Sequence, residues 1–240
     1  MKTLLTIIVC FYYSTLFAQT KRFSNVTYSD GDTTIWYHIT QNLVKDLSLI
    51  RIDTSSSTYY FRLWNTTQVL EIWKNIDSSF SGQLTTWVRE LTPANEKPTG
   101  RIQISKRILQ VDTVKLMHNL IEESQMVYLP TEDSIKGWRQ GFDGITYKTE
   151  FASKTSYDFK TYWTPKAQDS TLQVAKLVQS FVDTLFQSCN ANAIWKEFRK
   201  SIPFESYRYG ITNVSKVVTK KERRRFAAER KNYRQQKYLQ

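Results

Sequence analysis

The strongest constraint on the fold of this chain is a set of β-branched and aromatic runs that come in pairs with polar connections between them. The run 58–64 is separated from the run 67–73 by two polar residues, a connection short enough to predict a β-hairpin. The runs 83–91 and 101–109 predict a second hairpin with a long tip. This pattern predicts a sheet built from neighbouring antiparallel strands.

A third hairpin is predicted from residues 144–151 and 156–163, where apolar and charged side chains alternate. Successive side chains of a strand point to opposite faces, so one face of this hairpin is predicted to meet the core and the other to meet solvent, with its charges paired across the strands. The apolar face is expected to hold Ile145, Tyr147, Phe151, Tyr157, Phe159 and Trp163, and the charged face Lys148, Glu150, Asp158 and Lys160.

Helical periodicity interrupts the strand pattern at residues 112–124 and 170–186. Asp112 is predicted to cap the first helix, and Ser170 with Gln173 has the capping-box spacing that predicts the start of the second. The residues expected to face the core are Val114, Met117 and Ile121 in the first helix and Leu172, Ala175, Val178, Val182 and Leu185 in the second.

The remaining elements complete an α+β architecture. A shorter helix is predicted over 193–201, and single strands over 33–39 and 204–211. Because hairpins dominate and no strand–helix–strand unit recurs, we expect an antiparallel sheet packed against two or three helices. The predicted organisation is a signal peptide at 1–18, one α+β domain at 19–215 and a basic C-terminal tail at 216–240.

The N-terminus has the pattern of a secretory signal peptide. Lys2 precedes an almost uncharged apolar stretch that ends at Ala18, where we expect cleavage. Leu16 at the third position before the cleavage point, and the charges of Lys21 and Arg22 after it, leave an uncleaved anchor as the alternative. The Leu-Phe-Ala-Gln ending resembles signal peptides of exported Gram-negative proteins. That resemblance implies export to the periplasm, the outer envelope or the exterior.

No catalytic or metal-binding pattern is evident in the sequence. Without the signal peptide, Cys189 is the single cysteine, so no internal disulfide is possible, and we expect this thiol to be buried at a helix end. His38 and His118 are not in ligand spacing with it or with each other. We therefore predict no catalytic residues, no metal site and no cofactor.

One glycine-rich loop is a candidate binding site. Residues 137–144 concentrate aromatic and charged side chains in a connection, which is where binding residues are often found. A simple turn before the next strand is the alternative. The candidate ligand-binding residues are Trp138, Arg139, Phe142 and Asp143.

The tail carries most of the charge of the protein. Residues 216–240 hold ten Lys and Arg against two Glu, a net charge of +8 out of +12 for the chain. Their aromatic residues are too sparse to form an apolar stripe, so we expect a solvated helix that is marginal alone and lies outside the core. The residues expected to contact an anionic surface are Lys220, Lys221, Arg223, Arg224, Arg225, Arg230, Lys231, Arg234 and Lys237.

These observations predict a non-catalytic, exported, envelope-associated protein whose tail binds an anionic envelope surface or an acidic protein partner. Nucleic acid is not an expected partner behind a signal peptide. A solvated tail without any partner is one alternative. The other is an enzyme or ligand-binding module of the cell envelope that acts on glycans, using the loop at 138–143 together with Glu150 or Asp158.

Overall fold

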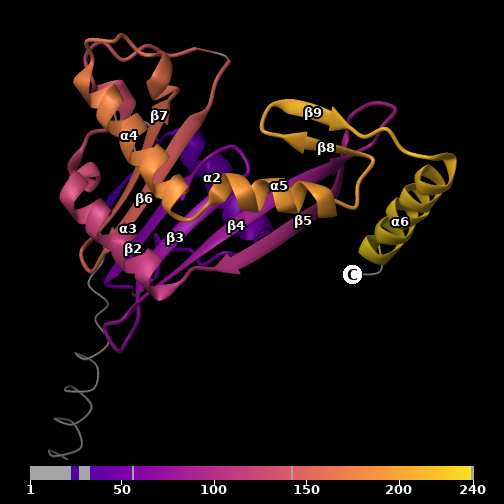
Figure 1. The fold of residues 1–240 in the computed structure, drawn as a ribbon, viewed down its shortest axis with the longest axis horizontal. Coiled ribbons are helices and arrows are strands. Elements are labelled where there is room, and N and C mark those ends of the chain that lie inside the picture. The colour runs from indigo at the N-terminus through magenta and orange to yellow at the C-terminus, as the bar shows by residue number, and fades with distance from the viewer. Residues whose placement is uncertain (1–22, 27–32, 56, 142, 239–240) are drawn as a thin grey trace, which may run out of the picture.

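The computed structural model describes residues 23–238, apart from 27–32, 56 and 142 (Figure 1). The predicted signal peptide lies outside the described residues. Within them, nine strands form one sheet and five α-helices surround it, so the protein is α+β as predicted. The sheet is mixed, however, because β1 (Phe23–Asn25) pairs parallel with β7 (Ser156–Trp163) while the other strand pairs are antiparallel.

The strands follow the order β1-β7-β6-β2-β3-β4-β8-β9, and β5 pairs with the other edge of β4. Each of the three pairs of runs with hairpin character forms an antiparallel pair, β2 with β3, β4 with β5 and β6 with β7. Pairing of β2 with β6 joins the first and third pairs into one sheet. The bounds are β2 Tyr59–Trp64, β3 Gln68–Lys74, β4 Phe80–Leu91, β5 Pro98–Ile108, β6 Thr146–Ser153, β8 Ser206–Tyr209 and β9 Thr212–Ser215.

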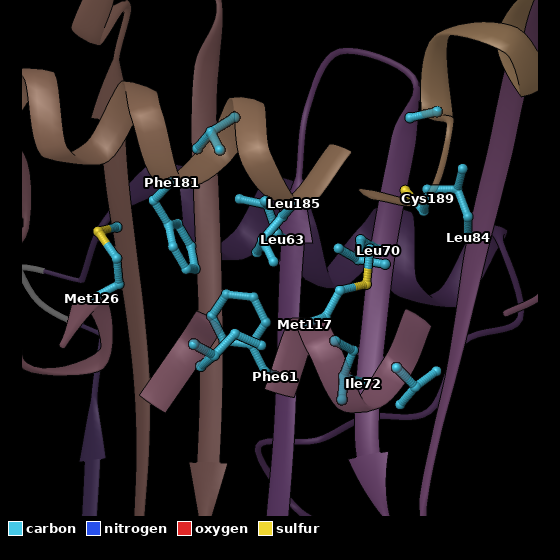
Figure 2. Packing of buried hydrophobic residues seen from close by; sticks show 14 of the residues in the cluster. Phe61, Leu63, Leu70, Ile72, Leu84, Met117, Met126, Phe181, Leu185 and Cys189 are labelled. Carbon is cyan, nitrogen blue, oxygen red and sulfur yellow. The ribbon is translucent and has the colours of Figure 1, made fainter. Parts of the chain in front are cut away.

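One face of the sheet is covered by α3 (Val111–Ser124) and α4 (Gln173–Ser188), and α5 (Ala191–Ser201) continues along it. Figure 2 shows Phe181 and Leu185 of α4 and Met117 of α3 meeting Leu63 and Leu70 of the sheet. The inward residues predicted for these helices are buried, apart from Leu172, which precedes α4. The predicted caps are wrong, because Gln110 and Leu172 occupy the N-cap positions and neither makes a side-chain cap bond.

The opposite face is covered by α2 (Ile35–Asp46), which corrects the strand predicted over 33–39. Trp36, Thr40 and Val44 are spaced four residues apart and turn toward the sheet. The aromatic and β-branched composition of the segment favours a strand. As a helix, however, the segment buries the stripe of Trp36, Thr40 and Val44 against the sheet. The Thr34 hydroxyl caps the helix by accepting a hydrogen bond from the Trp36 amide at 3.3 Å.

The third hairpin has no solvent face, which corrects the predicted division into one core face and one charged face. In its register Phe151 lies opposite Asp158, and Glu150 lies opposite Phe159. The apolar residues of the two strands therefore point to opposite faces of the sheet. Both faces are covered, and Lys148, Glu150 and Lys160 are all buried.

Short helical turns and a C-terminal hairpin complete the fold. The turns η1 and η2 run beside the part of β7 that does not pair with β1, where the Thr161 amide donates to the Thr131 hydroxyl at 3.2 Å. The strand predicted over 204–211 becomes the antiparallel pair of β8 and β9, which turns at Gly210 with a φ of 59°. The bounds of the turns are η1 Met126–Tyr128, η2 Glu132–Ser134 and η3 Pro165–Ala167.

Candidate functional site

The basic tail forms the last helix, α6 (Lys220–Tyr238), at the end of the molecule away from α3 and α4 (Figure 1). A capping box starts it. The Thr219 hydroxyl accepts from the Glu222 amide at 3.2 Å, and the Glu222 carboxylate accepts from the Thr219 amide at 2.8 Å. These reciprocal bonds satisfy the first free amides of the helix and define where it begins.

The inner face of α6 docks on the sheet, which differs from the expected appendage outside the core. Phe226 is only 4% exposed. Arg230 contacts the fully buried carboxylate of Glu90 at 3.3 Å, and Arg101 of β5 contacts the same carboxylate at 3.3 Å. The Tyr233 hydroxyl donates to the Gly100 carbonyl at 3.0 Å. One apolar anchor and these polar contacts hold the helix in a defined orientation.

Three of the nine basic residues predicted to contact an anionic surface have carboxylate partners within the protein. Arg230 pairs with Glu90, Arg223 pairs with Glu205 at 2.8 Å, and Arg225 contacts Glu229 at 3.7 Å. Arg230 is therefore a docking residue. Arg223 and Arg225 keep exposed side chains, but their charges are partly neutralised.

The outer face of α6 carries the free charges. Lys220, Arg224 and Lys231 are spaced four and seven residues apart, which places them on one stripe of the helix opposite Phe226. They are exposed, as are Lys221 and Arg234, and none of the five forms an ion pair with any residue that the structure describes. The side chain of Lys237 lies outside the described part of the chain.

Hydrogen bonds hold the predicted binding loop, residues 137–144, against the domain. The Trp138 indole donates to the Trp163 carbonyl at 3.1 Å and packs against the Tyr162 ring, so it belongs to the core on the α3 and α4 face. The backbone of Arg139 exchanges two hydrogen bonds with the Gln168 amide, at 2.8 and 3.0 Å. Asp143 is exposed, and Phe142 lies outside the described residues. The loop presents Arg139 and Asp143 to solvent but keeps Trp138 inside.

Glu150, the carboxylate proposed to act with that loop, points to the other face of the sheet. There it forms a buried ionic cluster with Arg62 of β2 and Glu71 of β3. Arg62 lies 3.1 Å from Glu150 and 2.7 Å from Glu71, and all three side chains are at most 1% exposed. Asp158 faces the opposite side and accepts a hydrogen bond from Asn25 at 3.3 Å. The structure therefore separates Glu150 from Trp138, because the two side chains lie on opposite faces of the sheet.

The cluster is saturated with hydrogen bonds. Tyr60 donates to Glu71 at 2.9 Å, and Tyr157 and Trp64 donate to Glu150 at 2.8 and 2.7 Å. Burial by itself would lower the pKa of Arg62, but the charges of Glu150 and Glu71 raise it overall, so the guanidinium stays charged. Because these side chains already have partners within the protein, we interpret the cluster as stabilising the fold rather than as binding a ligand. Its sequence signal is a charged residue inside each of three runs rich in apolar side chains, at 62, 71 and 150, and Lys148 is a second charge in the third run.

A cleft that the sequence did not reveal opens beside α5, with a volume of about 660 Å³. The β2–β3 turn, the start of β6, the junction of α4 with α5, and Tyr209 at the end of β8 surround it. Trp195 and Tyr209 form an aromatic wall, with ring centroids 4.8 Å apart. Sequence reasoning missed these residues because they come from four separate segments.

Neither a metal site nor a membrane span is evident in the described residues. No group of three or more His, Cys, Asp or Glu side chains among them could hold a metal ion. Of the helices in this part of the chain, none combines the length and the apolar character needed to cross a bilayer. The chain matches no protein-family model, and no curated protein or solved structure is significantly similar to it.

Proposed function

We propose that this chain is an exported, non-catalytic protein that binds an anionic surface of the cell envelope through the outer face of α6. The observation that carries the proposal is the free basic stripe of Lys220, Arg224 and Lys231 on a helix that the domain holds in place. The apolar N-terminal stretch supports the proposed export, because anionic lipid headgroups and lipopolysaccharide are polyanions that an exported protein meets.

The shape of the stripe favours a surface over a shaped pocket on a protein. The distance along the helix from Lys220 to Lys231 is about 16 Å at a rise of 1.5 Å per residue. Ala227 and Ala228, which are small and exposed, lie between these long side chains along the helix. Each Lys or Arg near an anionic bilayer contributes about 1 kcal/mol, and the attraction weakens with salt. Binding should therefore be sequence-independent and salt-sensitive.

Docking of α6 gives this interaction a fixed geometry. Because Phe226 and Arg230 hold the inner face, the exposed charges of the stripe lie on a helix whose orientation is fixed before any contact is made. A flexible tail would have to be ordered on binding, which costs conformational entropy. The docked helix avoids that cost.

The test is sedimentation of the protein with vesicles, comparing phosphatidylglycerol-rich with pure phosphatidylcholine membranes at low and high salt. The variant K220Q/R224Q/K231Q removes the stripe. We expect its affinity for anionic vesicles to fall on the order of a hundredfold, since three contacts of about 1 kcal/mol are lost. Wild-type binding should disappear on neutral vesicles and in high salt.

The matched control is K115Q/K136Q/K176Q, which removes three exposed lysines elsewhere on the domain and changes the net charge equally. It should bind anionic vesicles nearly as well as the wild type. Equal weakening of the two triple variants would show that net charge alone attracts the protein and would overturn the assignment to α6. Failure of the wild type to bind anionic vesicles at low salt would overturn the proposal itself.

A further inference from the structure

Part of the lining of the cleft beside α5 is a group of three polar side chains at the junction of α4 with α5. Gln187, Asn190 and Asn192 line it from the junction of α4 with α5, and their side chains are exposed. None of these three amides makes a side-chain hydrogen bond to a residue that the structure describes, although each offers both donors and an acceptor. The φ of Asn190 is 53°, a left-handed conformation that asparagine tolerates, and it produces the sharp turn that gathers the amides.

Aromatic rings form the other part of the lining. Trp195 and Tyr209 stand together at one side, Tyr147 of β6 contributes a half-buried ring, and Tyr209 is 36% exposed. Rings of this kind pack against apolar faces of a ligand, and tyrosine also offers a hydroxyl. The cleft therefore combines apolar platforms with several neutral hydrogen-bonding groups, the usual composition of a small-molecule site.

The charge in the cleft is balanced. Asp183 is its one acidic side chain and Lys196 its one basic side chain, so their formal charges have opposite signs. The Asp183 carboxylate is held by a hydrogen bond of 2.8 Å from Gln179, one turn earlier in α4. One lysine opposed by one carboxylate does not favour a phosphate or another polyanion. The lining instead matches a neutral ligand that has many hydroxyl groups and exposed C–H faces.

We propose that this cleft binds a carbohydrate, in the form of a short oligosaccharide of neutral sugars. Sugar rings present C–H faces to Trp195 and Tyr209 and hydroxyl groups to the amides of Asn190 and Asn192. The volume of about 660 Å³ lies within the range of roughly 300–1,000 Å³ found for small-molecule sites. This site uses different residues from α6, so it does not depend on the proposed binding of an anionic surface.

The test is calorimetric titration of the full chain with three neutral trisaccharides, namely maltotriose, cellotriose and triacetylchitotriose, followed also by tryptophan fluorescence. We expect saturable binding of at least one of them. Y209A and N192A should each weaken that binding about tenfold, because each removes one packing or hydrogen-bonding contact to the ligand. High salt should leave the affinity unchanged.

Matched controls are Y128A, which removes a tyrosine that is 80% exposed on η1, and N232A, which removes an exposed asparagine on α6. Both should bind the trisaccharide like the wild type. Circular dichroism checks that the cleft variants are folded, and N192D replaces N192A if the latter is not. Absence of saturable binding by all three trisaccharides overturns the proposal, as does equal weakening by the control and cleft variants.

Discussion

At the scale of single residues, the most unusual feature is a charged cluster inside the sheet. Arg62 contacts both Glu71 and Glu150, and no part of its side chain is exposed to solvent. Moving these charges out of water costs free energy. The ion pairs between Arg62 and the two carboxylates offset that cost only while each partner is present. Because the three residues lie on three adjacent strands, the cluster also favours one register of β3, β2 and β6.

The first prediction concerns this cluster. R62A should lower the free energy of unfolding by about 3–5 kcal/mol, because two carboxylates are then buried without their cation. R107A is the control, since Arg107 pairs with Glu197 at 2.8 Å on the surface and should contribute only about 0–1 kcal/mol. Urea denaturation measures both. A loss for R62A as small as that for R107A would show that the cluster does not stabilise the fold.

A second buried charge makes stability depend on pH. Lys148 lies under α2, with its ammonium 5.6 Å from the Trp36 ring centre and 5.8 Å from that of Trp64. Burial lowers the pKa of Lys148 from 10.5 to about 8, while the charge of Glu150 acts in the opposite direction. Between these two pKa values the unfolded chain binds more protons than the folded one. Lys148 therefore makes the free energy of unfolding rise with pH in this window.

K148M should remove this contribution. We expect the variant to be more stable than the wild type below pH 8, and the difference to shrink by about 2 kcal/mol between about pH 7 and pH 10. The buried tyrosines titrate in both proteins and cancel in the comparison. Chemical denaturation at several pH values measures the difference. Parallel pH profiles for the two proteins would contradict the assignment of the low pKa to Lys148.

At the scale of elements, α6 depends on its contacts with the domain. Its sequence has few apolar residues, and an isolated basic helix of this length is marginal in water. Phe226 and the contacts of Arg230 and Arg101 with Glu90 supply the missing stabilisation. The expected instability of the isolated segment stays a prediction, and in the structure the domain provides a docking site for the helix.

F226A should therefore release α6 while leaving the sheet intact. We expect faster trypsin cleavage and faster amide hydrogen exchange within 220–238, because the opening free energy of this helix falls when its apolar anchor is lost. The clusters of buried residues that pack α3 and α4 on the sheet should keep their protection. V217A, at a fully exposed position just before the helix, is the control. Equal protection of α6 in F226A and the control would contradict the role of Phe226.

At the scale of the whole molecule, the described helices pack against a single sheet. Helix α2 covers one face, and α3, α4 and α5 lie on the other, so the central strands β2, β3, β6 and β7 are mostly buried on both faces. Most of the net charge lies in the C-terminal 25 residues, at one end of the molecule. The proposed anionic-surface site and the proposed carbohydrate site thus differ in charge as well as in position.

Several features could be predicted because they depend on neighbouring residues. The α+β class and the inward stripes of α3 and α4 follow from periodicities of two and of three to four residues. The burial of Cys189 at the end of α4, where it is 5% exposed, follows from the apolar pattern before it. Export, envelope location and binding of an anionic surface stay predictions, since they concern partners of the chain.

By itself the sequence determined where strands and helices form along most of the chain and where its positive charge is concentrated. Tertiary structure alone decided that residues 35–46 form a helix, that Lys148 and Glu150 are buried, and that α6 docks through Phe226. It also brought Tyr147, Trp195 and Tyr209 around one cleft. The physical reason is that burial and proximity depend on which distant segments pair and cover one another, whereas helical and strand periodicity is a local property of the chain.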